Sequence, residues 1–241
     1  MSNFKLFLIC ALIGVAVAGY TNRIVGGQFA EENQFPFQVA LLRRGRLFCN
    51  GAIVHRRFVL TAAHCLFAGD EMFEAENIKV LYGTNKITSG GKYNRVEKIY
   101  VHEDFEGYQN DIALIEMKKD FVFGESADYI RIRNETVEEG TEVSVTAWGR
   151  TNFQLQYNKM TTESESDCSE NLADDFNANL LCLNGKVNTG VCFGDDGAPA
   201  FYNFELVGIA SYIKGPVCGT EKPDVFTNTA NFYEWITEKF D

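Results

Sequence analysis

The residues of this chain best suited to chemistry are one histidine and three aspartates in three short, widely separated motifs. His64 stands in the segment TAAHC, Asp111 opens the segment DIAL, and Asp195 and Asp196 share the turn GDDGAP. A histidine can exchange a proton near neutral pH, and a buried carboxylate beside it holds one tautomer and stabilises the charged form. These residue types indicate proton transfer at a histidine–aspartate pair, with Asp196 as the third member of the site.

Each of these residues also has an ordinary structural interpretation. A lone histidine usually fills a surface or core position, and His55 and His102 keep that interpretation because no motif surrounds them. His64 differs, because a disulfide at the adjacent Cys65 would hold it in place. Asp111 could be an ordinary turn acid, but the polar loop before it and the apolar residues after it favour a role beside the histidine.

Four motifs occur in a fixed order along the chain. RIVGG begins at Arg23, and TAAHC, DIAL and the turn from Gly194 to Pro199 follow it. This order resembles that of the trypsin/chymotrypsin-like (peptidase S1) superfamily, whose motifs carry the activation site, the catalytic histidine, the catalytic aspartate and the nucleophilic serine. The resemblance covers residues 24 to 241. It implies an all-β fold of two six-stranded antiparallel β-barrels, with the active site in the cleft between them.

The serine position of this resemblance is held by Asp196. A serine hydroxyl gives its proton to the histidine and attacks a carbonyl, whereas a carboxylate has no such proton at neutral pH. The backbone N–H groups of Gly194 and Asp196 should form the oxyanion hole, where a fixed negative charge would oppose the charge developing on a substrate oxygen. The carboxylate is also expected to pair with His64. We therefore expect no peptide hydrolysis by the usual route.

The resemblance also implies an activation step. Cleavage after Arg23 would free the amino group of Ile24, which would insert and pair with the carboxylate of Asp195. Each charge needs the other, because burying either one alone is costly. The expected activator is a trypsin-like protease.

The pocket positions depart from the trypsin pattern. Gly190 would lie at the base of the primary specificity pocket, where trypsins carry an aspartate, while Asp224 and Ile213 stand where glycines are usual. Ile213 is expected to narrow the entrance, Ala198 to add a methyl group beside the nucleophile turn, and Tyr212 to complete the pocket. Gly190 together with Asp224 is similar to the arthropod brachyurins, which have broad or collagen-cleaving specificity. Drift in a pocket no longer selected for cleavage explains the same departures.

The N-terminus predicts a secretory signal peptide over residues 1–18. Lys5 supplies a positive charge, the stretch from Leu6 to Val17 is apolar, and Ala18 ends a small-residue cleavage site. An apolar stretch of about 12 residues is too short to cross a bilayer, which takes about 20. We expect a secreted, extracellular protein with a short activation propeptide at 19–23 and one peptidase-like domain at 24–241.

Loss of the signal peptide removes Cys10 and leaves six of the seven cysteines. An even number in an oxidising compartment indicates three disulfides, although the number alone does not decide their pairing. No Cys-x-x-Cys spacing indicates a zinc site, and the acid-poor stretch from Gly83 to Val96 offers no calcium loop, so neither a metal nor a cofactor is expected. The resemblance implies three pairs: Cys49–Cys65, Cys168–Cys182 and Cys192–Cys218.

The charge of the chain restricts its partners. Removing residues 1–23 leaves 20 basic and 33 acidic residues, a net charge of −13, which disfavours nucleic acid and anionic membranes. The basic cluster from Arg43 to Arg46 is either a solvated hairpin tip or a local docking or cleavage site. Asn134 begins the one N-glycosylation sequon and is a candidate for modification. We expect a monomer whose partners are proteins: an active protease, an inhibitor or a protease substrate.

The elements that must position the motifs are mainly short strands. Apolar, β-branched runs separated by glycine-containing turns predict strands. They cover residues 37–42, 52–54, 58–60, 78–82, 143–147, 206–210 and 225–227. Only residues 230–240 have apolar side chains near helical spacing, which predicts a C-terminal helix packed on a β-barrel.

Together these features predict a secreted serine protease homologue that lacks the catalytic serine. It would act as a binding or regulatory pseudoprotease, matured by cleavage after Arg23. Two alternatives remain open. One is an active serine-type endopeptidase, and the other is an abundant secreted protein that binds a ligand through its surface rather than its cleft.

Overall fold

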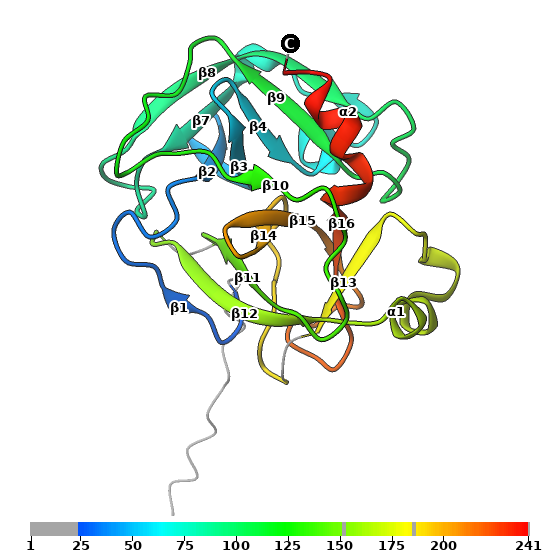
Figure 1. The fold of residues 1–241 in the computed structure, drawn as a ribbon. Coiled ribbons are helices and arrows are strands. Elements are labelled where there is room, and N and C mark those ends of the chain that lie inside the picture. The colour runs from blue at the N-terminus through cyan, green and yellow to red at the C-terminus, as the bar shows by residue number, and fades with distance from the viewer. Residues whose placement is uncertain (1–23, 151–152, 185–186, 241) are drawn as a thin grey trace, which may run out of the picture.

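The chain folds into two β-barrels that lie side by side (Figure 1). A computed structural model describes residues 24–150, 153–184 and 187–240, so the predicted signal peptide, the propeptide and Arg23 lie outside the described residues. Barrel 1 closes in the strand order β2-β3-β4-β9-β8-β7. Its strands are β2 (Gln38–Arg43), β3 (Arg46–His55), β4 (Phe58–Thr61), β7 (Ile78–Tyr82), β8 (Lys92–Val101) and β9 (Ala113–Met117).

Barrel 2 is built from the second half of the chain. Its sheet runs in the order β12-β11-β14-β15-β16-β13, and a pairing of β12 with β13 closes it. Its strands are β11 (Glu142–Ala147), β12 (Gln156–Thr162), β13 (Leu180–Asn184), β14 (Pro199–Tyr202), β15 (Glu205–Ile213) and β16 (Asp224–Asn228). The prediction of two six-stranded antiparallel barrels is confirmed.

Short elements complete the fold. The two-residue strands are β1 (Gln28–Phe29) on β12, β10 (Arg131–Ile132) on β15, and the pair β5 (Phe67–Ala68) and β6 (Glu71–Met72). The 3₁₀ turns are Ala63–Leu66, Ala75–Asn77, Ala173–Asp175 and Thr229–Phe232, and the α-helices are α1 (Glu165–Leu172) and α2 (Tyr233–Thr237). No helix among the described residues is long and apolar enough to cross a membrane.

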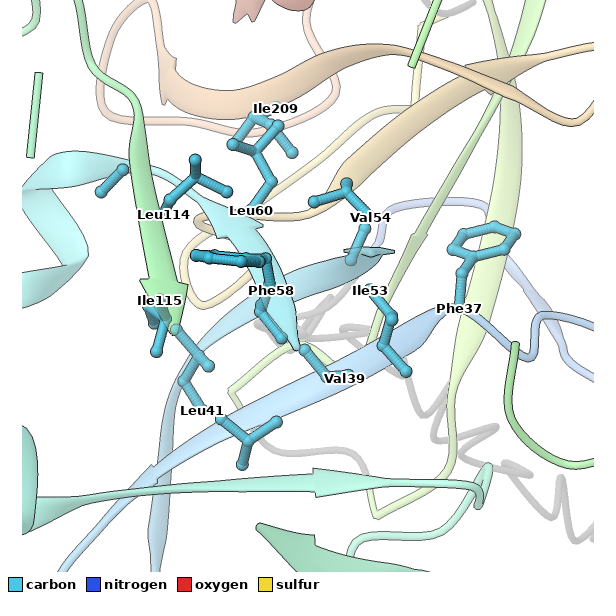
Figure 2. Close-up of a cluster of buried hydrophobic side chains, with 14 of the residues drawn as sticks. Phe37, Val39, Leu41, Ile53, Val54, Phe58, Leu60, Leu114, Ile115 and Ile209 are labelled. Atoms are coloured by element: carbon cyan, nitrogen blue, oxygen red, sulfur yellow. The ribbon is translucent and has the colours of Figure 1, made fainter. Parts of the chain in front are cut away.

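The core joins the two barrels. The alternate side chains Val39 and Leu41 of β2 belong to the barrel 1 cluster, as the two-residue period of a strand predicts. Strands β3, β4 and β9 are buried on both faces and contribute consecutive residues to it (Figure 2). Ile209 of β15 belongs to the same cluster although its strand is part of barrel 2. Phe232 and Ile236 also pack there, so the chain returns from barrel 2 and closes over barrel 1 with α2.

The helices differ from the sequence prediction. The predicted C-terminal helix is present but shorter, with α-helical geometry only from Tyr233 to Thr237 after a 3₁₀ turn. Helix α1 is not among the predicted elements, because its sequence has no apolar stripe. A side-chain cap begins it, with Ser164 Oγ accepting the N–H of Asp167 at 3.0 Å, and its buried side chains are Cys168 and Leu172.

The six cysteines of the described chain form three disulfides. The pairs are Cys49–Cys65, Cys168–Cys182 and Cys192–Cys218, as the resemblance implies. The first joins β3 to the 3₁₀ turn after β4, the second fastens α1 to β13, and the third joins the residue just before the Asp195 turn to the loop that follows β15.

The β14–β15 hairpin generates a stability prediction. Its two turn residues, Asn203 and Phe204, have φ of 48° and 61°, and the Phe204 side chain is 81% exposed. A left-handed conformation costs a residue with a Cβ about 1–2 kcal/mol, and little packing is lost with an exposed ring. Phe204→Gly is therefore expected to raise the free energy of unfolding by about 0.5–1 kcal/mol in denaturant titrations.

Phe29→Gly is the matched control. Phe29 is also well exposed, but it lies in strand β1 and its φ is not positive. Its replacement should leave the protein no more stable. Equal effects of the two substitutions would contradict the assignment of strain to Phe204.

Candidate active site

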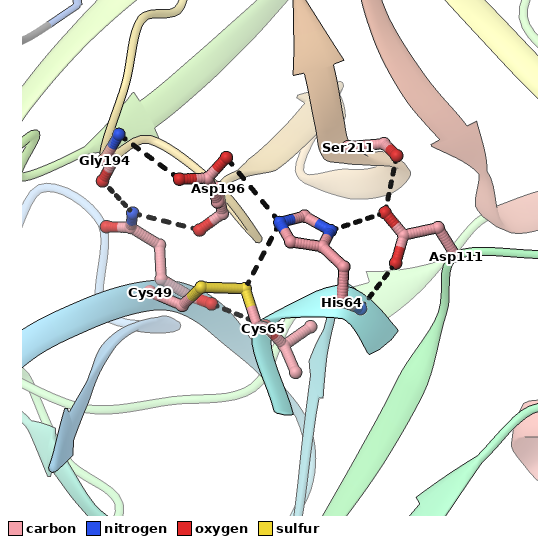
Figure 3. Close-up of polar contacts among 9 residues, drawn as sticks. Cys49, His64, Cys65, Asp111, Gly194, Asp196 and Ser211 are labelled. Carbon is pink, nitrogen blue, oxygen red and sulfur yellow. Dashed lines mark hydrogen bonds and ion pairs between the residues drawn. A yellow bond between two sulfur atoms is a disulfide. The ribbon is translucent and has the colours of Figure 1, made fainter. Parts of the chain in front are cut away.

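His64 is held at the edge of barrel 1 by its backbone and by its ring. It lies in the 3₁₀ turn Ala63–Leu66, which the Cys49–Cys65 disulfide ties to β3. Its backbone N–H donates to Asp111 Oδ1 at 2.8 Å, and its Nδ1 lies 2.7 Å from Asp111 Oδ2. The structure therefore brings together His64 and Asp111, the pair predicted from sequence (Figure 3).

Asp111 is fully buried and bound from both barrels. It lies two residues before β9 of barrel 1, while Ser211 Oγ of β15 donates to its Oδ2 at 2.5 Å. Thr227 Oγ1 of β16 donates to its backbone carbonyl oxygen at 2.8 Å. A buried carboxylate is stable only when its oxygens are paired, and here donors from His64 and Ser211 bind them.

The Asp196 carboxylate lies on the other side of the histidine ring. Its Oδ1 is 3.6 Å from His64 Nε2, and its Oδ2 accepts the backbone N–H of Gly194 at 3.2 Å (Figure 3). The Gly194 N–H is one of the two donors expected to form the oxyanion hole. One side chain thus pairs with the histidine and binds a donor that a reacting carbonyl oxygen would need.

The charge of His64 follows from these contacts. Burial disfavours its protonated form, but hydrogen bonds and charge attraction from Asp111 and Asp196 outweigh burial and raise the pKa of His64 to about 10. At neutral pH the ring is an imidazolium between two carboxylates. It can give up a proton there, but it cannot accept one.

Asp195 has a different environment from its neighbour. Its side chain is buried, its Oδ2 accepts the N–H of Cys192 at 2.8 Å, and its Oδ1 has no hydrogen-bond partner among the described residues. Burial raises the pKa of Asp195 well above its usual value; the Cys192 N–H opposes this, and the nearby carboxylates of Asp196 and Asp224 add to it. The orphaned oxygen is a buried acceptor suited to a cation.

The segment after Arg23 is already packed against barrel 2. Ile24 is buried in the barrel 2 core, and the backbone of Val25 pairs with that of Gly190 through hydrogen bonds of 2.7 and 3.1 Å. Asn158 Nδ2 donates to the carbonyl oxygen of Val25 at 3.0 Å. The start of the predicted domain thus lies against the loop that leads to the Asp195 turn.

Asn50 supports the turn of Gly194 to Asp196, and sequence reasoning missed it. It is fully buried in β3. Its Nδ2 donates to the carbonyl oxygen of Gly194 at 3.0 Å and to that of Asp196 at 3.3 Å. Its backbone N–H also donates to the carbonyl oxygen of Asp196, at 2.8 Å. Gly197 follows at φ 74°, where a Cβ would collide with the carbonyl oxygen of Asn50. No local signal identifies Asn50, since its partners are more than 140 residues away in the chain.

A cavity of about 160 Å³ opens beside Asp196. Of the four predicted pocket residues, Tyr212 and Ile213 line it, whereas Gly190 and Asp224 do not. Asp224 is buried, and its Oδ2 accepts the N–H of Val191 at 2.7 Å. Burial raises the pKa of Asp224 to about 7, against the opposing effect of that N–H. A Cβ on Gly190 would collide with the same oxygen, so these two residues pack together outside the cavity lining.

Two aromatic residues that line this cavity, Tyr108 and Phe193, were not identified by the sequence analysis. The Tyr108 ring packs against the Tyr212 ring at a tilt of 40°, with centroids 4.7 Å apart, and its centroid lies 5.8 Å from that of His64. The other residue, Phe193, is 46% exposed. Burial and the nearby Asp175 raise the pKa of Tyr212 to about 12. Ala198 is fully buried in the barrel 2 core and is not part of the cavity lining.

The remaining predicted sites lie away from the cleft. Arg44 and Gly45 form the tip of the β2–β3 hairpin, and the Arg43 guanidinium stacks 3.8 Å from the ring centroid of Phe73. Asn134 is exposed just after β10. The sulfurs of Cys49 and Cys65 lie within 4.8 Å of a ring nitrogen of His64, but their disulfide bond leaves no thiolate to bind a metal.

Comparisons with known proteins agree with this geometry. The trypsin family model matches residues 24–236. The chain is 37% identical to serine protease SP24D of Anopheles gambiae, over 89% of this chain and 80% of that protein. It is 32% identical to trypsin epsilon of Drosophila erecta, over 95% of this chain and 93% of that protein. The solved structure of neuropsin, a serine protease expressed in the limbic system of mouse brain, has a similar fold, with a TM-score of 0.83. The two sequences are 24% identical, and the match covers 90% of this chain and 100% of neuropsin's.

The position of His64 predicts a pH dependence. Its folded-state pKa of about 10 lies above the ordinary 6.5, so its stabilising contribution is complete below pH 6.5 and is lost as the pH rises through about 10. The free energy of unfolding is expected to fall over this interval. NMR of the labelled imidazole should show His64 titrating near pH 10.

Asp196→Ser removes one carboxylate partner and should lower the pKa of His64 and flatten that pH dependence. His55 is the internal control, because burial and Arg56 lower its pKa below the ordinary value, so it titrates on the acid side. Titration of His64 near pH 6.5 in the natural chain would contradict an ion pair of the His64 ring with both Asp111 and Asp196.

Proposed function

The chain belongs to the trypsin family, and we propose that it is a secreted member without peptidase activity that acts by binding proteins rather than by hydrolysing peptides. One observation carries the proposal: the Asp196 carboxylate stands between His64 Nε2 and the Gly194 N–H. It occupies the places of the nucleophile and of the oxyanion at the same time.

This arrangement opposes each requirement of acyl transfer. The nucleophile position holds a group without a transferable proton, and the base is already protonated because two carboxylates raise its pKa to about 10. A substrate carbonyl oxygen would have to displace a carboxylate oxygen from the Gly194 N–H and then develop negative charge beside it. In subtilisin, loss of the serine alone costs about 10⁶ in turnover. In this chain the oxyanion hole, which provides the catalysis that remains after such a loss, is also blocked by the Asp196 carboxylate.

Maturation by cleavage after Arg23 is part of the proposal. A new ammonium group at Ile24 would have a buried acceptor in the orphaned Oδ1 of Asp195, and a buried carboxylate gains most from an opposite charge. The side chain of Ile24 is already in the barrel 2 core. A trypsin-like protease that cuts after arginine would perform this step.

The cleft is the proposed binding surface. A cavity lined by Tyr108, Phe193 and Tyr212 offers aromatic contact area to a peptide loop of an inhibitor, of a protease substrate or of an active protease. Gly190 and Asp224 support a relationship to the brachyurins within the family, because they pack against each other in this chain. Three disulfides support secretion into an oxidising compartment.

A surface-binding role is the second candidate. It is favoured by the β2–β3 hairpin, where Arg43, Arg44 and Arg46 form no ion pair with another described residue although the chain carries a net charge of −11. Such a hairpin suits an acidic partner. Occupancy of the cleft distinguishes this role from the proposed one.

Reversion of Asp196 tests the loss of catalysis. The natural chain, cut after Arg23, is expected to show no turnover on a mixed peptide library. Asp196→Ser should recover little activity alone and more when combined with Ile213→Gly, because serine restores the nucleophile and glycine opens the cavity. If the natural chain cleaves peptides and His64→Ala abolishes this cleavage, the protein is an active endopeptidase and the proposal is wrong.

Inhibitor binding tests the cleft. Macromolecular peptidase inhibitors are expected to bind the mature chain by calorimetry, and Ile213→Gly should tighten binding about tenfold or more, which corresponds to about 1.4 kcal/mol. Val122→Gly, at an exposed site outside the cavity lining, is the control and should change nothing. If neither the natural chain nor the Ile213 variant binds, the surface-binding role takes precedence.

A further inference from the structure

The Asp196 carboxyl group is held as the acyl group of an ester intermediate would be. One oxygen faces the histidine at 3.6 Å, and the other accepts the Gly194 N–H at 3.2 Å. Hydrolysis of an acyl-enzyme needs the same two partners: a histidine that takes a proton from water, and a donor for the carbonyl oxygen. In this chain the carbon between those partners is Cγ of Asp196 itself.

A carboxylate has different targets from a serine. Attack on a peptide carbonyl would give a high-energy anhydride, whereas attack on the sp³ carbon of a strained ring gives a stable ester. We propose that Asp196 is a carboxylate nucleophile toward small aryl or alkyl epoxides, and that His64 with the Gly194 N–H hydrolyses the resulting ester to release a 1,2-diol. This activity goes beyond the proposed function and does not depend on it.

The first step forms the ester. Asp196 Oδ1 attacks a ring carbon, a new C–O bond forms, and the C–O bond of the epoxide breaks. The epoxide oxygen takes the Nε2 proton of the His64 imidazolium. The products are a neutral hydroxyalkyl ester of Asp196 and a neutral imidazole.

The second step hydrolyses that ester. Neutral His64 takes a proton from water as the water oxygen attacks Cγ, and the negative charge develops on Oδ2, which already accepts the Gly194 N–H. Collapse breaks the bond between Cγ and Oδ1, and the leaving alkoxide takes the proton from His64. The new carboxylic acid of Asp196 then returns a proton to His64. The sum is epoxide plus water to diol, with no oxidant or reductant.

The charge of His64 changes in the direction that each step needs. Before attack, two carboxylates hold its proton, with a pKa of about 10, so a proton donor faces the epoxide oxygen. Esterification neutralises Asp196 and removes one of those carboxylates, which lowers the pKa of the ring and lets it act as a base. Asp111, bound by Ser211, holds the ring orientation throughout.

The cavity selects the size and polarity of the electrophile. Asp196 lines it together with Tyr108, Phe193 and Tyr212, and its volume of about 160 Å³ is close to the cavity of about 150 Å³ that holds benzene in an engineered protein. The phenol groups of Tyr108 and Tyr212 can donate hydrogen bonds to an epoxide oxygen. Tyr212 keeps its proton at neutral pH because burial raises its pKa to about 12.

Styrene oxide is the probe for a direct test. The secreted protein, before and after cleavage at Arg23, is incubated with it in H₂¹⁸O, and diol and protein are analysed by mass spectrometry. In a single turnover the diol should receive an unlabelled oxygen from Asp196, and the peptide that contains Asp196 should gain 2 Da. His64→Gln should abolish diol formation, because it removes both the proton donor of the first step and the base of the second.

Asp196→Ala should reduce diol formation to the rate in buffer, and alanine is preferred because an asparagine before Gly197 would deamidate back to aspartate. Asp120→Asn is the control, since Asp120 is an exposed carboxylate 3.4 Å from Arg56 and should leave the rate unchanged. Absence of both diol and adduct in the natural chain would overturn the proposal, as would labelled oxygen in the first-turnover diol or equal labelling of other carboxylates. Peptidase activity is measured separately, so failure here leaves the binding role standing.

Discussion

The buried carboxylate of Asp111 is the interaction on which the geometry of the cleft depends. It is fully desolvated, so every acceptor position must be met by a donor from the protein. Those donors come from both barrels: the backbone and ring of His64 from barrel 1, and the hydroxyl of Ser211 from barrel 2. Because one carboxylate needs partners from both sides, it fixes the position of the histidine relative to β15 and the cavity.

A second set of polar contacts positions the turn of Asp196 against barrel 1. The Asn50 side chain and backbone bind the carbonyl oxygens of Gly194 and Asp196, and Trp148 and Gln38 bind the Asn50 Oδ1 in turn. Hydrogen bonds are directional, and partial burial strengthens them. They hold the carboxylate of Asp196 beside His64, where a flexible turn would let it swing into solvent.

Two adjacent carboxylates have opposite roles because their surroundings differ. Asp195 is almost fully buried; burial raises its pKa, and its Oδ1 has no hydrogen-bond partner among the described residues. Asp196 points into the cleft, where its side chain is 38% exposed and charge attraction to His64 keeps the ring protonated. A scaffold suited to serine chemistry therefore holds a preorganised ion cluster of Asp111, His64 and Asp196. The group available for reaction in it is a carboxylate instead of a hydroxyl.

The sequence by itself determined the fold class, the histidine–aspartate pair and the disulfide pairs implied by the family resemblance, because short contiguous motifs and strand periodicity carry that information. The predicted strands over residues 78–82 and 143–147 are present in β7 and β11. Helix α1 escaped prediction because a cap and a disulfide hold a polar segment that has no apolar stripe. Asn50, Tyr108 and Phe193 were not identified from sequence, because their roles arise only when distant strands and loops meet. Tertiary structure alone decided which oxygen of Asp196 faces the histidine and which faces the Gly194 N–H, since a residue type specifies a carboxylate but only packing specifies its direction.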